Sequence, residues 1–67
     1  MRITPTMPPQ QIARILARYC DDRDIPHSRF GRDTVNDPRL IFDLRAGRKP
    51  RPKTLDRINT AIVEALV

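Results

Sequence analysis

The stretch SRFGRDTVNDPRLIFDLRAGRKPRPKT, residues 28–54, contains the signals that decide how this chain folds. At its centre, Val-Asn-Asp-Pro is typical of a tight connection between two helices, because Asn36 tolerates left-handed backbone angles. Asp37 is expected to cap the second helix and Pro38 to open it, since proline is favoured at the first helical position. The sequence therefore predicts one helix that ends, a short turn, and a new helix that begins.

The helix before this connection is expected to begin at His27 or Ser28, because the residue before Pro26 avoids helical backbone angles. It should run to about Thr34, with Phe30 as its contact to the core. Proline has no side-chain oxygen that could cap the first turn, so capping is expected to move to Ser28.

The helix after the connection is expected to span residues 38–46. Ile41 and Leu44 share one face, with Leu40 beside them, and this spacing indicates the side that packs on the core. Gly47 follows directly and is the type of residue that most readily ends a helix. The sequence predicts a short helix with an apolar side and a polar side.

Two longer amphipathic helices are expected on either side of this pair. The first should be opened by Pro9 and end near Asp22, and its apolar residues recur at helical spacing: Ile12, Ile15, Leu16, Tyr19 and Cys20. The last follows a basic, proline-broken segment, and its apolar residues are Leu55, Ile58, Ile62, Ala65 and Leu66. Residues 1–8 are rich in proline and are expected to form an extended arm. The prediction is a single all-α domain over residues 1–67, with four to five helices.

The positive charge of the chain is concentrated in one segment. The net charge is +5 at pH 7, and the whole excess falls between Ser28 and Lys53, where Arg and Lys outnumber Asp by eight to three. Such a segment attracts polyanions, which include DNA, RNA, anionic lipid and acidic protein surfaces. Arginine outnumbers lysine there, and this favours nucleic acid, because the guanidinium fork matches phosphate oxygens and the guanine edge.

The composition argues against several other classes of function. One histidine, one cysteine and no plausible carboxylate pair leave no nucleophile-and-base arrangement, so neither an enzyme nor a cofactor is expected. Asp21, Asp22 and Asp24 form an acidic cluster, but their spacing is not that of an EF-hand loop, and no metal site is expected. The lone Cys20 is expected to be buried, and the lack of a long apolar run or secretory signal predicts a cytoplasmic protein without membrane contact.

The segment from residue 25 to residue 58 resembles the lambda-repressor-like, or Xre-type, helix-turn-helix family of small bacterial and phage transcriptional regulators. Phe30 and Gly31 resemble the family's Leu-Ala pair in the first short helix, and Gly31 would let the second helix approach closely. The other matching positions are the two core residues of the recognition helix, the glycine turn and the start of the next helix: Ile41, Leu44, Gly47, Pro52 and Thr54.

This resemblance implies sequence-specific binding of double-stranded DNA by a transcriptional regulator, in the first place a repressor, with the helix over 38–46 in the major groove. The residues expected to face base edges are Pro38, Arg39, Phe42 and Asp43. Those expected to contact phosphates are His27, Ser28, Arg29, Arg45, Arg48, Lys49 and Arg51.

Three of the expected base contacts have a defined chemistry. Arg39 can donate two hydrogen bonds to guanine, which makes it the principal candidate for reading a base. Asp43, four residues further on, can hold that guanidinium in place or accept a hydrogen bond from cytosine. Phe42 lies off the apolar stripe; it either contacts a thymine methyl group or packs under the neighbouring loop, and we favour packing.

Two alternatives concern partners. Thr60, Val63 and Val67 form a second apolar stripe on the last helix, and since the family binds paired half-sites as dimers, a homodimer through these residues is expected. The alternative function is an antitoxin-like or phage accessory module whose basic face binds an acidic protein. RNA binding is a third hypothesis, but the chain has only three aromatic residues and no evident stacking platform.

Overall fold

The computed structural model describes residues 3–4 and 6–65, with side chains up to residue 63. Over these residues the chain forms four helices and no strand, so the all-α prediction is confirmed. The helices are α1 (Pro9–Asp22), α2 (His27–Val35), α3 (Leu40–Arg45) and α4 (Pro52–Ala65). No helix in the described part of the chain has the length and apolar character that a bilayer span requires.

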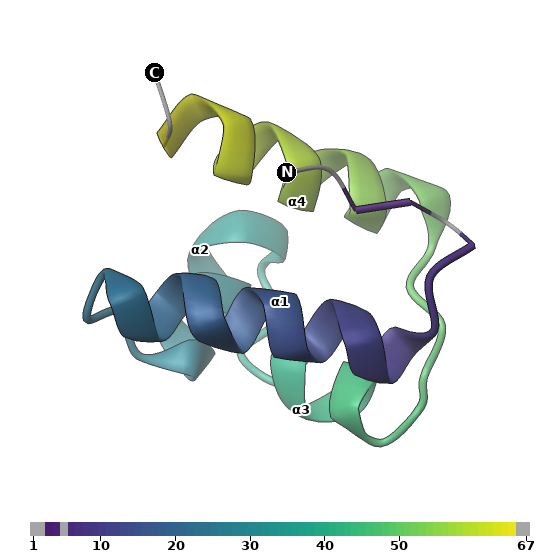
Figure 1. Ribbon diagram of the computed structural model, residues 1–67. Helices are drawn as coiled ribbons and strands as arrows, with labels where there is room; N and C mark the ends of the chain where they lie inside the picture. The colour runs from purple at the N-terminus through teal and green to yellow at the C-terminus, as the bar shows by residue number, and fades with distance from the viewer. Residues whose placement is uncertain (1–2, 5, 66–67) are drawn as a thin grey trace.

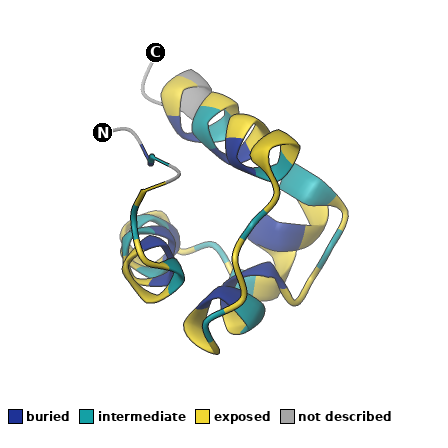
Figure 2. Cartoon of the chain, turned by 90° about the vertical axis from the view of Figure 1, so that its right-hand side faces the viewer, coloured by how far each residue is buried: buried dark blue, intermediate teal, exposed yellow. Residues whose placement is uncertain are grey.

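The four helices enclose one small core. In Figure 1, α1 crosses the middle of the molecule, with α4 above it and α3 below it. α3 packs against α1 and α2, whereas α4 packs against α2. Figure 2 shows the buried positions turned toward the centre and α3 again at the edge opposite α4. The buried hydrophobic residues come from all four helices and from the arm before α1: Ile3, Ile12, Ala13, Leu16, Cys20, Phe30, Leu40, Ile41, Leu44, Leu55, Ile58 and Ile62.

α1 has the bounds that the sequence predicts, Pro9–Asp22. Its inner side carries Ile12, Leu16 and Cys20, each no more than 1% exposed. Burial raises the pKa of the Cys20 thiol, and the neighbouring charge of Asp21 raises that pKa further. The thiol therefore stays protonated near neutral pH and acts as a small apolar side chain in the core.

α2 begins two residues earlier than a cap at Ser28 requires. The carbonyl oxygen of Pro26 accepts the first helical hydrogen bond, from the Phe30 N–H at 3.1 Å, so Pro26 is the N-cap residue. No side chain caps the helix, and Ser28 lies inside its first turn. The prediction that Ser28 caps α2 is therefore wrong, because the chain is already helical at His27.

The connection between α2 and α3 is as tight as predicted. Asn36 has left-handed angles, φ 58° and ψ 33°, and ends α2. The Asp37 side chain accepts a hydrogen bond from the Arg39 N–H (3.0 Å), and its carbonyl oxygen accepts one from the Leu40 N–H (3.2 Å). These bonds place Pro38 and Arg39 in a turn, so α3 begins at Leu40 instead of Pro38 and is shorter than the predicted helix over 38–46.

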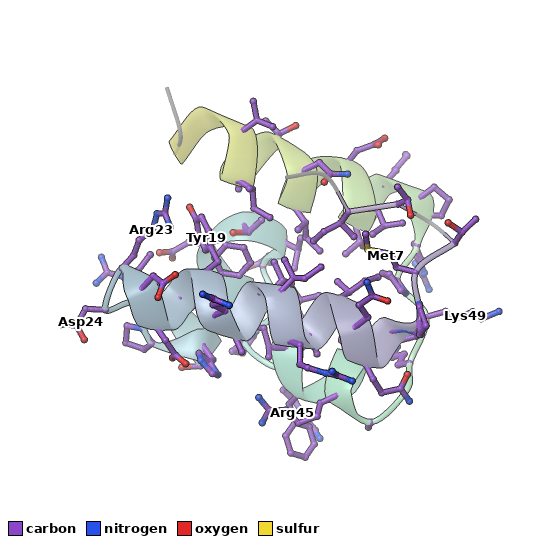
Figure 3. The ribbon with its side chains drawn as sticks, viewed as in Figure 1. Met7, Tyr19, Arg23, Asp24, Arg45 and Lys49 are labelled. Carbon is purple, nitrogen blue, oxygen red and sulfur yellow. The ribbon has the colours of Figure 1, made fainter. Side chains whose placement is uncertain are left out.

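The arm before α1 is fastened to α4. Ile3 is 1% exposed and belongs to the core, which the sequence did not predict. Its N–H donates to the Asn59 side-chain oxygen, and the Asn59 side-chain nitrogen donates to the Ile3 carbonyl oxygen, both at 2.9 Å. Met7 packs against the same core from the turn that leads into α1 (Figure 3). The arm therefore contributes to the fold, since it supplies a core side chain and two hydrogen bonds.

Candidate nucleic-acid interface

α3 has an inner side that packs on the core and an outer side that faces solvent. Leu40, Ile41 and Leu44 are each at most 6% exposed, so the predicted apolar stripe is confirmed. The exposed positions in the turn before α3, on α3 and just after it are Pro38, Arg39, Phe42, Arg45 and Ala46. α3 lies at the edge of the molecule in both views (Figures 1 and 2).

Phe42 is on this outer side, and 61% of it is exposed. The prediction that it packs under the neighbouring loop is therefore wrong. The loop after α3 passes beside Asp43 and Leu44, on another side of the short helix. Phe42 contacts Arg39 instead: the guanidinium carbon lies 5.4 Å from the ring centroid, within the range of a cation–π interaction.

Asp43 is turned toward the loop that follows α3. Its carboxylate accepts a hydrogen bond from the Arg48 guanidinium at 3.2 Å, and its backbone carbonyl accepts one from the Arg48 N–H at 3.0 Å. The predicted pairing of Asp43 with Arg39 is not formed, because Arg48 occupies the carboxylate and Arg39 lies over Phe42. Asp43 therefore holds the loop against α3, and its side chain is only 23% exposed.

The loop between α3 and α4 brings together three of the predicted phosphate contacts. Gly47 has a φ of 100°, which lets the chain leave α3 and double back along it. A groove of about 280 Å³ lies between α3, the loop and the start of α4, and its cationic lining residues are Arg48, Lys49 and Arg51. Asp43 partly neutralises Arg48, and Asp37 also lines the groove, so the excess positive charge comes from Lys49 and Arg51.

Arg45, a predicted phosphate contact, lies beside α1. No residue of α1 was predicted to contact nucleic acid. A depression is lined by Arg45 together with Arg14 and Arg18 of α1, and Asp21 and Asp22 lie in the same lining; Figure 3 shows Arg45 below α1. Arg18 is 4.0 Å from Asp22, and both side chains are largely exposed, so this pair is weak. Counting charges by sequence segment did not reveal Arg14 and Arg18 as neighbours of Arg45, because only the packing of α1 on α3 brings them together.

The start of α2 carries the remaining predicted contacts, His27, Ser28 and Arg29. The His27 ring nitrogen is 3.0 Å from Asp21, and the Arg29 guanidinium is 3.5 Å from Asp33, while Ser28 is exposed. Because these pairs are solvent-exposed, His27 and Arg29 can leave their carboxylate partners and bind a phosphate instead at a small cost in free energy. Among the described residues, no group of three His, Cys, Asp or Glu side chains is arranged to hold a metal ion.

The predicted dimer stripe is described only in part. Thr60 and Val63 are on α4, and both are exposed, Val63 by 50%. Val67 lies outside the residues that the structure describes. A homodimer through this stripe stays a prediction.

Comparison with protein families, curated proteins and solved structures found no match for this chain. What it binds must therefore be inferred from its own side chains. The most distinctive of these are the exposed residues of α3, with cationic side chains from the following loop and from α1 nearby.

Proposed function

We propose that this chain binds double-stranded DNA in a sequence-selective way as a transcriptional regulator, with α3 in the major groove. α2, the turn and α3 then act as a helix-turn-helix of the lambda-repressor-like kind. The observation that carries the proposal is the exposed outer side of α3 at the edge of the molecule, with Arg39 turned to solvent. A helix with its side chains is about 10–12 Å across, and the major groove is about 12 Å wide.

The distribution of cations supports this placement. Lys49 and Arg51 lie in the loop after α3, and Arg45 lies on its other flank beside α1. Within the described part of the chain, none of these three is within ion-pair distance of a carboxylate. Cations on both sides of an inserted helix can contact the phosphates that border the groove, and such contacts set the register of a protein on DNA.

Arg39 supports selectivity as well as affinity. Its guanidinium is exposed and has no carboxylate partner among the described residues. The five N–H donors of a guanidinium need acceptors, and guanine offers two adjacent ones, O6 and N7, in the major groove. A contact of this kind is worth about 1–3 kcal/mol of discrimination against another base.

The proposal is tested by selecting bound duplexes from a random pool at physiological salt, with the wild-type chain and with Arg39→Ala. We expect the wild type to enrich a defined sequence and Arg39→Ala to lose the preference at one or two guanine positions. The loss should be about 5- to 150-fold at those positions, from the energy of a bidentate contact. Arg57→Ala is the matched control, because Arg57 is an exposed arginine on α4, away from α3.

Two other outcomes would contradict the proposal, and a third would change only the role assigned to Arg39. Equal binding of every duplex by the wild type would mean that only the phosphate backbone is recognised. Absence of duplex binding, together with binding to an acidic protein, would favour the protein-interaction module. If Arg39→Ala weakens binding to all duplexes by equal factors, Arg39 contacts only a phosphate and does not read a base.

The loop cations have a separate expected signature. Lys49→Ala and Arg51→Ala should each weaken binding to preferred and random duplexes by similar factors, because phosphates carry no sequence information. Each variant should also lower the slope of log affinity against log salt concentration by about 0.9, the value for one lost phosphate contact. The measurement is a fluorescence-anisotropy titration at several salt concentrations, with Arg57→Ala as the charge-matched control. An unchanged slope in both loop variants would exclude this loop from the DNA interface.

A further inference from the structure

We propose that Arg39 and Phe42 act as a pair that reads a guanine with a thymine as its neighbour. The inference rests on the proposed DNA binding and names the bases that α3 selects. Only two large hydrophobic side chains are exposed among those that the structure describes, Phe42 and Val63, and Phe42 is the more exposed. It lies between the exposed Arg39 and Arg45. A polar residue would be better solvated than phenylalanine at this exposed position.

The contact between the two side chains leaves the donors of Arg39 available. Arg39 is three positions before Phe42, and its guanidinium lies over the ring with its carbon 5.4 Å from the centroid. Among the described residues, the Arg39 guanidinium donates no hydrogen bond to a protein acceptor, so the contact with the ring leaves its N–H groups free for a base. These groups can donate to guanine O6 and N7. Phe42 therefore restricts the orientation of the side chain that we assign to the guanine.

The ring itself suits one group in the major groove. The thymine 5-methyl is the apolar group that the major-groove edges of unmodified DNA present, and phenylalanine is among the side chains that contact it. Successive bases are about 3.4 Å apart along a strand. Two groups whose centres are 5.4 Å apart can thus reach neighbouring base pairs, and they are too close to read distant ones. This favours a thymine directly beside the guanine.

Asp43 does not interfere with base contacts by Arg39 and Phe42. Its carboxylate is held by Arg48 on the loop side of α3, so it neither neutralises Arg39 nor presents an acceptor beside Phe42. The Arg39 guanidinium contacts the aromatic ring, and this contact can be kept when its N–H groups meet a base. The pair therefore needs no rearrangement to present one apolar and one donor group to the groove.

The test uses the duplex selected by the wild-type chain and removes single groups from its bases. Replacing the thymine beside the guanine by deoxyuridine removes only the methyl group and should weaken wild-type binding about three- to fivefold. Phe42→Ala should bind both duplexes equally, while it keeps a weakened preference for guanine, because the ring no longer restricts Arg39. Phe42→Leu should keep the discrimination against deoxyuridine, because an apolar contact remains. Val63→Ala, at the other exposed hydrophobic residue, should behave as the wild type.

The possible failures can be told apart. If a duplex is selected but no deoxyuridine substitution changes wild-type affinity, the reading of thymine is overturned, and the proposed function stands. If Phe42→Ala keeps the full discrimination, another residue contacts the methyl group, and the pairing is overturned. If no duplex is preferred, the proposed function itself fails and this inference with it. A thermal melt of each variant checks that the fold is intact, as expected for changes at exposed positions.

Discussion

Alanine in place of Gly31 is expected to destabilise the chain by about 2–4 kcal/mol, which is a large fraction of the stability of so small a domain. A Cβ atom on Gly31 would clash with the backbone carbonyl oxygen of Asp37 and would lie 3.0 Å from the Leu40 Cβ. The clash is with backbone, which cannot rotate away as a flexible side chain can. Because Asp37 also donates its N–H to the Gly31 carbonyl at 3.1 Å, the turn is held close to α2 at this point.

Helix propensity acts in the opposite direction but is smaller. Alanine is favoured over glycine inside a helix by about 1 kcal/mol, and Gly31 lies within α2. If the turn were loosely packed, this term alone would make Gly31→Ala stabilising. The sign of the measured change therefore reports directly on how closely α3 approaches α2.

The measurement is a thermal melt followed by circular dichroism. The melting temperature of Gly31→Ala should fall by roughly 8–30 °C, at about 4–8 °C per kcal/mol for a domain of this size. Ser28→Ala provides the control in the same helix, since Ser28 is exposed and makes no capping bond, and it should change stability by less than about 0.5 kcal/mol. A Gly31→Ala melting temperature equal to that of the wild type would show that the turn can move aside.

The helices could be predicted from the sequence where the signals are local. Asn36 and Gly47 take positive φ angles, as their residue types indicate, and Pro9 begins α1. The start of α3 could not be located in this way. Proline is favoured at a first helical position, but here the Asp37 side chain bonds to the Arg39 N–H and holds Pro38 in the preceding turn. Two local preferences compete at this point, and the sequence does not show which is stronger.

The candidate site was predictable in its charge but not in its contacts. The sequence locates the cationic segment, yet it pairs Asp43 with Arg39 by helical spacing, whereas the returning loop brings Arg48 to that carboxylate. Phe42, for which we favoured packing under the neighbouring loop, is exposed, because that loop runs along another side of α3. Each of these outcomes depends on the path of the chain after Gly47, which residue spacing does not specify.

Ile3→Ala is expected to cost about 2–4 kcal/mol, because it removes most of a side chain that is almost completely buried. The burial of Ile3 depends on a contact with Asn59, 56 residues away, so no local pattern in the sequence could reveal it. Asn59→Ala removes both hydrogen bonds to the Ile3 backbone and should cost about 1–3 kcal/mol. Thr6→Ala is the control in the arm, since Thr6 is exposed and, among the described residues, its side chain bonds only to Thr4, and its effect should be below about 0.5 kcal/mol.

The two changes should not add. The Asn59 amide holds the backbone of the same residue whose side chain fills the core, so either substitution releases the arm and removes the other contact as well. In urea denaturation, the double variant should therefore lose about as much free energy of unfolding as Ile3→Ala alone, with a coupling energy of about 1 kcal/mol or more. Losses that add to within about 0.5 kcal/mol would mean that Ile3 stays docked without Asn59. The arm would then be held by apolar packing alone, and the paired hydrogen bonds would serve only to satisfy the backbone of Ile3.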